Sequence, residues 1–559
     1  MKHSILKKIG VALVALSAAV FTLKVFGGLP WIGGFLLIAL LLVAPAIGGV
    51  LLFYDRYFSR PAGIDNDDVY HNSSTKAGAI GILLGILLTS FYIVIYLGDK
   101  PWLHYQKDAP ATVQVDASGK ITGVSGPAAD DLRRLCWQCP NKGDADGWWR
   151  DAEYKAILPY TGSYHKLGAR TLPDAKGDRV QNGDEAQGEI ENEISVNNIY
   201  LLRVAIDEQQ PGAIQFFVTD SPHHFALRNV YSMLNPLARL ITGKNADNWF
   251  FYGTLYTFAI LLFGVRMIWK YRHNNYHIIR TISVMFFQLG FGYMIPNILV
   301  LFKQPGFYFS YWWPLKPEYF YPSTWAGYAA DANSLGLYFV IFGALMSFVA
   351  VPVLTFLYGK RWYCSWVCGC GGLAETMGDP FRQLSDKSLK AWQAERWLIH
   401  GVLVIITVVT GLLWANSFSG GELLGSYSQA MSEAYGFYIG AIFSGVIGVG
   451  FYPIFGSRVW CRFGCPMAAI LGMGQKFFSR FRITTNGAQC ISCGNCSTYC
   501  EMGIDVRWYA QRGQNIIRSS CVGCGVCAAV CPRGVLRLEN GPVDSIFTRY
   551  NDPQATVLN

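Results

Sequence analysis

Eight long apolar runs restrict the fold of this chain more than any other feature. Each run is long enough to cross the roughly 30 Å hydrocarbon core of a bilayer as one helix. Hydrophobic residues make up 52% of the sequence, which favours a membrane protein over a soluble globular one. We therefore predict an α-helical multi-pass membrane protein, with spans at about 9–27, 31–53, 77–97, 249–269, 281–302, 335–358, 397–414 and 436–456.

The first run is interpreted as a membrane anchor and not as a cleaved signal sequence. Lys2, Lys7 and Lys8 precede it, as they would in a signal sequence. However, no convincing small-residue cleavage site comes before Pro30, and a second apolar run follows at once. The run is therefore counted as the first of the eight spans.

Lysine and arginine gather in alternate short loops, which predicts the orientation because such residues stay on the cytoplasmic side. The opposite loops, at about 303–334 and 415–435, carry only Lys303 and Lys316. With eight spans, both termini then lie in the cytoplasm. The net charge of +9 follows from this bias and gives no reason to expect nucleic acid as a partner. The inner loops carry Lys270, Arg272, Arg280, Lys360, Arg361, Arg382, Lys387, Lys390 and Arg396.

Eight of the fifteen cysteines lie between residues 490 and 531, in two copies of one spacing. Each copy has three cysteines at C-x2-C-x2-C and a fourth after three further residues. With this spacing, three thiolates of one loop hold a 4Fe-4S cluster whose fourth ligand comes from the other copy. We assign cluster A to Cys490, Cys493, Cys496 and Cys531, and cluster B to Cys521, Cys524, Cys527 and Cys500. A zinc ribbon or disulfides are the alternatives, but zinc usually takes two separated pairs of cysteines.

This segment resembles the bacterial two-cluster ferredoxins over about residues 484–540. The resemblance implies a small α+β domain with two 4Fe-4S clusters. One departure is Glu501, which follows Cys500 where the family usually has proline. The number of ligands is unaffected, so we expect the departure to change the loop geometry and the reduction potential. Gly523 and Gly525 fit loops whose amides approach cluster sulfurs closely.

Two further cysteine pairs follow apolar runs at the predicted cytoplasmic face. Cys364 and Cys368 follow the sixth span, and Cys461 and Cys465 follow the eighth, each pair spaced C-x3-C after an aromatic residue. Residues four apart share one face of a helix, so each pair is expected to present two thiolates to a common site. Cysteine is also a small buried hydrophobe, but that neutral interpretation does not explain the doubling. Cys370 adds a thiol to the first pair and leaves three alternatives: a third cluster, another metal, or a redox-active thiol set.

The spans, the two C-x3-C pairs and the C-terminal cysteine repeat together resemble the NosR/NapH-type membrane ferredoxins over about residues 249–540. Members include an accessory protein of nitrous oxide reductase and the quinol-oxidising subunit of periplasmic nitrate reduction, and the cupric reductase of oxidase assembly shares the cysteine arrangement. The resemblance implies a bacterial cytoplasmic (inner) membrane protein. The family usually has C-x3-C-P, which Cys465-Pro466 keeps and Cys368-Gly369 does not. One member carries flavin on a Ser/Thr-Gly-Ala-Thr motif that residues 98–248 lack, so flavin is not implied.

Residues 98–248 form one long polar region on the predicted outer face. Alternating apolar and polar residues across 111–124, with glycine in the turn, predict a β-hairpin. Further apolar runs at 199–206 and 213–218 suggest a small mixed α/β domain. The function of this domain is not predicted.

Cys136 and Cys139 form a C-x-x-C pair in this outer region, without the histidine that attachment of a c-type haem needs. A short-loop disulfide is the plain interpretation outside the cytoplasm. A redox-active dithiol and a pair of metal ligands are the alternatives. The adjacent His223 and His224 are interpreted as surface polar residues, because neighbours point to different faces of most backbones.

An aromatic outer loop and a few histidines complete the candidate features. The loop is interpreted as an interfacial belt, with a quinol headgroup pocket or a docking surface as alternatives. His400, His273 and His277 do not form a matched pair of axial ligands, so a b-type haem is not supported. The aromatic residues are Phe307, Tyr308, Phe309, Tyr311, Trp312, Trp313, Tyr319, Phe320, Tyr321 and Trp325.

These observations predict a membrane-bound iron–sulfur protein that passes electrons between its ferredoxin domain and a quinone pool or an extracytoplasmic partner. An assembly factor that reduces a metal ion or a thiol of a client enzyme is the rival hypothesis, and a subunit of a larger complex is a third. Whether the chain is itself an enzyme is left open. The expected segments are three spans (1–97), an extracytoplasmic domain (98–248), a five-span core (249–483), a ferredoxin domain (484–540) and a tail (541–559).

Overall fold

A computed structural model provides the structure of this chain. It describes residues 2–25, 28–29, 31–58, 71–73, 76–97, 107–115, 121–125, 192–196, 200–206, 213–220, 230–302, 304–330, 335–425 and 427–541. The chain divides into two compact units. The first holds the long helices and the C-terminal cysteine repeat, and the second holds most of residues 94–233.

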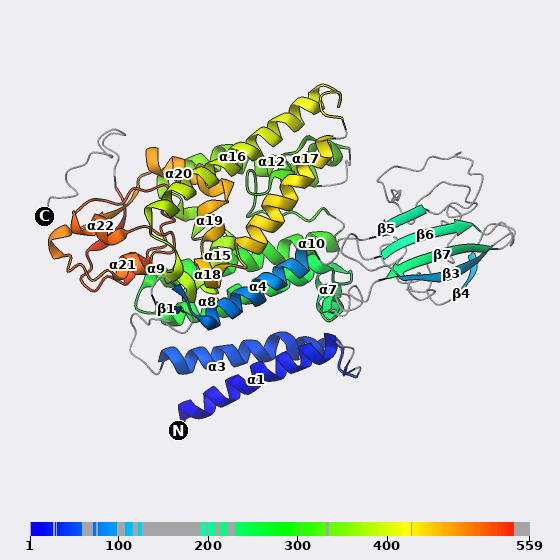
Figure 1. Ribbon diagram of the computed structural model, residues 1–559, viewed down its shortest axis with the longest axis horizontal. Coiled ribbons are helices and arrows are strands. Elements are labelled where there is room, and N and C mark those ends of the chain that lie inside the picture. The colour runs from blue at the N-terminus through cyan, green and yellow to red at the C-terminus, as the bar shows by residue number, and fades with distance from the viewer. Residues whose placement is uncertain are drawn as a thin grey trace. The chain divides into compact units, whose positions relative to one another are not determined.

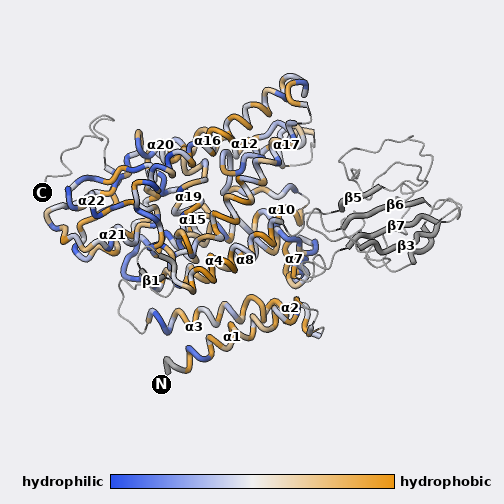
Figure 2. The backbone as a smooth tube through the Cα atoms, in the orientation of Figure 1, coloured by the Kyte–Doolittle hydropathy of each residue, from blue (hydrophilic) through white to orange (hydrophobic). Residues whose placement is uncertain are grey.

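Among the described residues, eight helical segments are long and apolar enough to cross a membrane. They correspond to the eight predicted spans and indicate a multi-pass membrane protein. Figure 1 shows these helices, and hydrophobic residues (orange) predominate along them in Figure 2. The segments are Ile5–Val25, Gly34–Phe58, Ala79–Tyr96, Asn248–Lys270, Asn275–Leu301, Gly336–Tyr358, Leu389–Phe418 and Tyr427–Ile447.

The first five spans are built from α1 (Lys2–Val25), the run α2 (Gly34–Ile38), η1 (Ala39–Val43) and α3 (Ala44–Phe58), then α4 (Ala79–Leu97), α8 (Asn248–Lys270), and the run α9 (Asn275–Leu289), η7 (Gly290–Met294) and α10 (Ile295–Leu301). The last three are α12 (Gly336–Leu345) with η9 (Met346–Ala350) and α13 (Val351–Tyr358), α16 (Leu389–Phe418), and α17 (Tyr427–Tyr435) with η11 (Gly436–Ile447).

Three of the π-helical stretches, η1, η7 and η9, end two residues before a proline. The prolines are Pro45, Pro296 and Pro352. Proline lacks an amide hydrogen, and its ring clashes with the carbonyl of the preceding turn. A wider π-turn before the ring relieves this clash and lets the span continue.

The last span ends earlier than predicted. The sequence suggests 436–456, whereas the helix runs over Tyr427–Ile447 and a turn follows. Gly448 and Gly450 lie in this turn, where a Cβ on Gly448 would come within 2.8 Å of the Trp460 Cβ. Val449 and Tyr452, which follow Ile447, are buried inside the protein and do not extend the span.

Short helices follow the sixth and eighth spans and line the interior of the bundle (Figure 1). After the sixth span come α14 (Arg361–Cys364), α15 (Gly369–Thr376) and the 3-10 helix η10 (Asp379–Leu384). After the eighth come α18 (Tyr452–Phe455), α19 (Val459–Phe463) and α20 (Pro466–Phe477). Helix α15 packs on α8 and α9, while α20 packs on α13 and α16.

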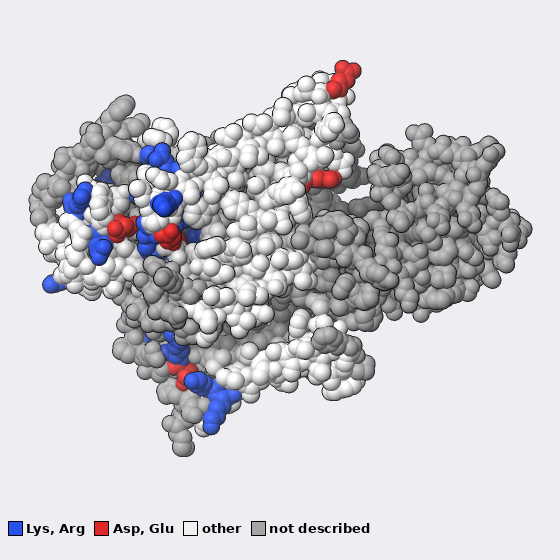
Figure 3. Space-filling view, viewed as in Figure 1, with Lys and Arg blue, Asp and Glu red and all other residues white. Residues whose placement is uncertain are grey.

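The C-terminal cysteine repeat folds as a small α+β domain, as predicted. Strands β8 (Phe481–Thr485) and β9 (Leu536–Asn540) pair antiparallel, from Phe481 opposite Asn540 to Thr485 opposite Leu536. Between them lie the 3-10 helix η12 (Gly487–Gln489) and the short helices α21 (Asn495–Thr498), α22 (Val506–Gln511) and α23 (Val526–Ala529). Figure 3 shows Lys and Arg gathered over this domain and over the ends of α1 and α3, beside a broad belt without charged side chains.

The outer loop between the fifth and sixth spans folds back into the bundle, which its interpretation as an interfacial belt did not foresee. It contains η8 (Pro317–Phe320) and α11 (Pro322–Ala329). Trp312 is only 2% exposed and packs with the buried Tyr363. The Tyr363 hydroxyl donates to the Ser310 carbonyl at 2.9 Å. Irregular backbone at membrane depth is tolerated where protein surrounds it.

The second unit contains a five-stranded antiparallel sheet in the order β4-β3-β7-β6-β5. Its strands are β3 (Lys107–Val115), β4 (Ile121–Ser125), β5 (Asn192–Val196), β6 (Tyr200–Ile206) and β7 (Ala213–Asp220). The β3–β4 pair is the predicted hairpin, and β6 and β7 cover the two predicted apolar runs. The mixed α/β character stays a prediction, and Cys136, Cys139, His223 and His224 lie outside the described residues.

The smaller elements of the first unit are β1 (His71–Ser73), which pairs with β2 (Lys76–Ala77), and α7 (Asn235–Thr242). Helix α7 packs against α10.

Candidate iron–sulfur sites

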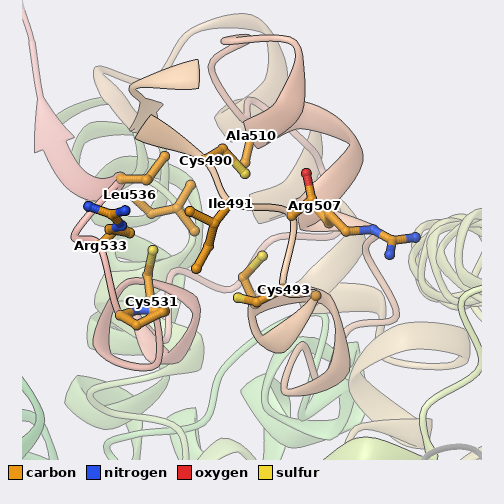
Figure 4. A pocket seen from close by; sticks show the side chains of 13 residues that line it. Cys490, Ile491, Cys493, Arg507, Ala510, Cys531, Arg533 and Leu536 are labelled. Carbon is orange, nitrogen blue, oxygen red and sulfur yellow. The ribbon is translucent and has the colours of Figure 1, made fainter. Parts of the chain in front are cut away.

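The first candidate site, site A, is a cavity among the cysteines assigned to cluster A. Cys490, Cys493, Cys496 and Cys531 all line it, together with apolar residues such as Ala510 and Leu536. Figure 4 shows Cys490, Cys493 and Cys531 around this space, with Arg507 and Arg533 at its edges. Cys493 is exposed, so site A lies close to the surface of the domain.

The second candidate site, site B, is lined by Cys500, Cys521, Cys524 and Cys527. Its other walls are mainly apolar, and Cys521 and Cys527 are buried. Burial raises the pKa of Cys521 to about 11, so a positive metal centre is needed to hold it as a thiolate. Both cavities thus bring together the two crossed sets of four cysteines, and their ligation of clusters is carried forward as a proposal.

Side chains of the membrane core hold the backbone of the site B loop at four consecutive carbonyls. The Gln475 amide donates to the Cys521 carbonyl at 2.7 Å, and the Ser365 hydroxyl donates to the Val522 carbonyl at 2.8 Å. The last two donors come from α9: the Tyr276 hydroxyl reaches the Gly523 carbonyl, and the Arg280 guanidinium reaches the Cys524 carbonyl, both at 2.8 Å. The loop is therefore fixed against the spans, with Ser365 directly beside Cys364.

The third candidate site, the span-end site, contains Cys364, Cys368, Cys461 and Cys465. Each of these cysteines is 5% or 6% exposed. Every pair among the four thiols is close enough to interact electrostatically. Within the described part of the chain, no three His, Cys, Asp or Glu side chains group as ligands of a single metal ion. A 4Fe-4S cluster takes one thiolate on each of its four irons, so the four cysteines supply the number of ligands that such a cluster needs.

The two C-x3-C pairs do not lie on single helices, contrary to the expectation from their spacing. Cys364 ends α14 and Cys461 lies in α19, whereas Cys368 and Cys465 are the extended N-cap residues of the next helices, α15 and α20. Proline in the first turn of α20 explains the break in the second copy, because it disfavours helical backbone in the preceding residue.

The two copies share one backbone arrangement although only one has the proline. The Cys368 amide donates to the Tyr363 carbonyl at 2.8 Å, and the Cys465 amide donates to the Trp460 carbonyl at 2.9 Å. In each copy the acceptor is the aromatic residue before the first cysteine. Gly369 replaces the proline at a crowded position, where a Cβ would lie 2.3 Å from the Tyr311 hydroxyl oxygen.

Cys370 lies beside Cys368 at the span-end site. The interaction between the two neighbouring thiols lowers the pKa of Cys368, despite its burial. Burial raises the pKa of Cys364 to about 12. The four predicted ligands therefore differ in how easily they ionise, and Cys370 favours the thiolate form of one of them.

Glu501, the departure from the ferredoxin pattern, lies at the centre of a buried charge network. Its carboxylate pairs with Arg382 at 2.7 Å and with Arg458 at 3.1 Å, and the three side chains are fully buried. Burial alone would raise the pKa of Glu501, but the two guanidinium groups outweigh it and lower the pKa. The network continues from Arg458 to Glu375 and from Arg382 to Asp379.

Arg458 links site B to the span-end site. Besides the Glu501 carboxylate, its guanidinium contacts the Cys461 sulfur at 3.6 Å and donates to the Cys364 carbonyl at 3.2 Å. From the sequence, Arg382 was expected only as a charge of an inner loop, and no role was predicted for Arg458. The sequence signal for this network is the glutamate in place of proline after Cys500.

Two family models match the C-terminal half of the chain. A model described as a 4Fe-4S binding domain matches residues 340–388 and 437–484, which include both C-x3-C pairs. A model described as a 4Fe-4S dicluster domain matches residues 482–532. These matches support iron–sulfur clusters in this chain.

Three curated proteins illustrate the similarity. "Putative electron transport protein YccM" of Escherichia coli K12 is 29% identical over 173 residues, which cover 29% of this chain and 47% of that protein. "Methylamine utilization ferredoxin-type protein MauN" of Methylobacillus flagellatus is 28% identical over 28% of this chain and 54% of the relative. "Uncharacterized protein MJ0749" of Methanocaldococcus jannaschii is 24% identical over 30% of this chain and 61% of the relative.

The chain spans about half the length of the curated relatives it matches. No solved structure matches. The NosR/NapH-type resemblance stays a prediction. The geometry and the comparisons together indicate an iron–sulfur protein of the electron-transport kind, with ferredoxin domains beside a set of membrane spans.

Proposed function

We propose that this protein is a membrane-bound electron carrier with three iron–sulfur centres in series. They would link the cytoplasm to a quinone pool or to an extracytoplasmic redox partner. One observation carries the proposal: the four carbonyls of residues 521–524 are held by side chains of the membrane core, one of which is next to Cys364. These contacts hold the site B loop against the core near Cys364, which supports a relay in which site B lies between site A and the span-end site.

The cysteines of sites A and B would hold the two ferredoxin clusters. Cys364, Cys368, Cys461 and Cys465 would hold the third, as the 4Fe-4S model that covers both pairs supports. When bound, such clusters supply one-electron chemistry that needs no protonation of the protein. The chain's own task is then to place the centres, to exclude water and to set their potentials.

Arg458 contributes to the potential of the span-end site in this proposal. Its guanidinium lies 3.6 Å from the Cys461 sulfur, and it is fully buried. A positive charge and a hydrogen bond to a ligand sulfur both stabilise the more negative, reduced form. Arg458 therefore raises the reduction potential of the span-end centre. Glu501 moderates this effect because its carboxylate partly neutralises the guanidinium charge.

The proposed location is the cytoplasmic membrane of a bacterium, with both termini in the cytoplasm. The predicted inner loops carry most of the lysine and arginine of the short loops. A cytoplasmic tail also suits cysteine ligands, because disulfide formation is suppressed there. A cysteine added at the C-terminus can be probed with a thiol-reactive label that does not cross membranes. The added cysteine should react only after the cells are opened. Its reaction in intact spheroplasts would overturn this orientation.

Anaerobically purified full-length protein tests the proposed function. After chemical reduction, its visible iron–sulfur absorbance should bleach, and a short-tail quinone should restore the absorbance with no other protein present. If cupric ion restores it and no quinone does so at any concentration, the rival role of an assembly factor that reduces metal ions is favoured.

A further inference from the structure

We propose that a cavity beside the span-end cysteines binds the headgroup of a membrane quinone. This inference rests on the proposed relay and names the chemical class of its membrane partner. The cavity has a volume of about 220 Å³. A cavity of roughly 150 Å³ is large enough to hold a benzene ring in another protein, so this one can hold a substituted six-membered ring.

The cavity lies against the predicted ligands of the third cluster. Cys370, which lies two residues after Cys368 in the chain, forms part of the wall. Pro466, which directly follows Cys465, forms another part. A ring in this space is therefore separated from the span-end thiols by little more than the cavity wall, which suits direct electron exchange.

One polar group in the wall lacks a partner. Trp460 lines the cavity, is 6% exposed, and its indole N–H has no hydrogen-bond acceptor among the described residues. Buried donors without an acceptor are uncommon in folded proteins. A carbonyl oxygen of a quinone would supply the missing acceptor.

Two charged side chains line the cavity on the side that is formed by the folded-back outer loop. Lys316 and Glu318 line the cavity and pair at 3.7 Å, with side chains 35% and 54% exposed. They mark an opening to water. A quinol that loses two electrons to become a quinone also releases two protons. The electrons would enter the proposed relay, and the protons would leave through this opening; reduction of the quinone would reverse both flows.

The last span gives the cavity access from the lipid phase. Gly436, Gly440 and Ser444 line it from η11, four residues apart along the helix. A Cβ on either glycine would meet no atom within 4 Å. The helix η11 belongs to a membrane-spanning segment, so a lipid-soluble ring can enter the cavity directly from the membrane. A water-soluble ligand would have to enter through the outer loop. This difference favours quinone over a water-soluble ligand.

Photo-cross-linking tests the inference on the full-length, iron-loaded protein in lipid nanodiscs. The probe is an azido-benzoquinone with a decyl tail, and the labelled peptides are identified by mass spectrometry. We expect labels on the segments around Ser444 and Leu315, which excess short-tail quinone removes. Labels confined to other segments, or labels that excess quinone does not remove, would overturn the assignment.

Two variants and a matched control sharpen the test. Gly440→Leu fills open space in the cavity and should reduce specific labelling at least tenfold. Gly411→Leu makes the same change on α16, where a Cβ also meets open space, and should leave labelling unchanged. Trp460→Phe removes one donor and should weaken quinone binding about threefold to tenfold. Undiminished labelling in both Gly440→Leu and Trp460→Phe would contradict the site.

Iron content and the reduced-state paramagnetic signal separate this inference from the proposed function. Both should be unchanged in Gly440→Leu. If the unmodified protein held no clusters at all, the relay itself would fail. If it held its clusters but was not labelled in the cavity, only the quinone site would fail.

Discussion

The two cysteine loops of the ferredoxin domain have matching spacing but very different surroundings. Ser492 and Gly523 occupy equivalent positions and share a left-handed backbone, with φ of 60° and 62°. A Cβ on Gly523 would lie 2.6 Å from the Arg361 Cβ, whereas Ser492 is exposed. The loop of site B needs glycine because the membrane core packs on it, and the loop of site A does not.

The residues after the fourth cysteines show the same contrast. Gly503 and Gly534 share φ of 65° and 63°. A Cβ on Gly503 would meet Arg462 at 2.3 Å, but one on Gly534 would meet nothing within 4 Å. Site B thus faces the spans and site A faces away from them. In the proposed relay, site A would therefore exchange electrons with a soluble partner and site B with the membrane core.

The largest expected difference between the two sites comes from removing a ligand of each. Cys527→Ser should lose about four irons per chain and loosen the whole domain from the core, because the site B loop forms the contact. Cys493→Ser should lose a similar amount of iron but keep the contact. Iron analysis with limited proteolysis of the membrane protein checks both. Equal release of the domain by the two variants would contradict the docking of the site B loop alone.

The next largest effect concerns the residue after the fourth cysteine. Glu501→Ala leaves Arg382 and Arg458 buried without this partner, which should destabilise the protein by about 3–5 kcal/mol. The equivalent residue in the other copy is the exposed Pro532, and Pro532→Ala should have little effect. Thermal unfolding in detergent measures both. A Glu501→Ala protein as stable as the Pro532→Ala protein would show that the network contributes nothing.

A reciprocal exchange at the equivalent loop positions should have a smaller but asymmetric effect. Gly523→Ser forces a side chain against Arg361 and should shift the paramagnetic signal of the site B cluster. Ser492→Gly removes an exposed side chain whose hydroxyl accepts a hydrogen bond from Gln511, inside the ferredoxin domain, and should change the signal of cluster A less. Paramagnetic resonance spectra of the two reduced variants measure these changes. Equal changes in the signals of the two clusters would contradict the docking of only one loop.

The smallest effect is expected from single hydrogen bonds of the docked loop. Ser365→Ala removes the donor to the Val522 carbonyl and should cost about 0.5–1.5 kcal/mol. Hydrogen exchange of the amides in residues 521–525 should accelerate, while that of residues 490–496 should not change. Equal acceleration in both loops would mean that the variant loosens the domain as a whole.

Much of the membrane architecture could be predicted because its signal is local. A long apolar run has few alternatives to a spanning helix, so all eight spans were found. The crossed cysteine sets also followed from spacing, and the structure places each set around one cavity. The breaks at Cys368 and Cys465 were missed because helical spacing alone gives no sign of where a helix stops.

The contacts between domains could not be predicted from the sequence. The carbonyls of residues 521–524 accept hydrogen bonds through the backbone, which leaves no trace in the side chains. The pairing of Glu501 with Arg382 and Arg458 joins residues far apart in the chain. Only the unusual glutamate after Cys500 pointed to it. The folded-back outer loop was equally hidden, since aromatic residues suit both an interface and a buried core.

The proposed relay depends most on a third iron–sulfur centre at the span ends, next to site B. Iron per chain, measured on anaerobically purified protein beside the Cys461→Ser variant, tests it most directly. We predict about twelve irons in the unmodified protein and about eight in the variant, with the paramagnetic signals of the two ferredoxin clusters retained. About eight irons in both proteins would contradict the account.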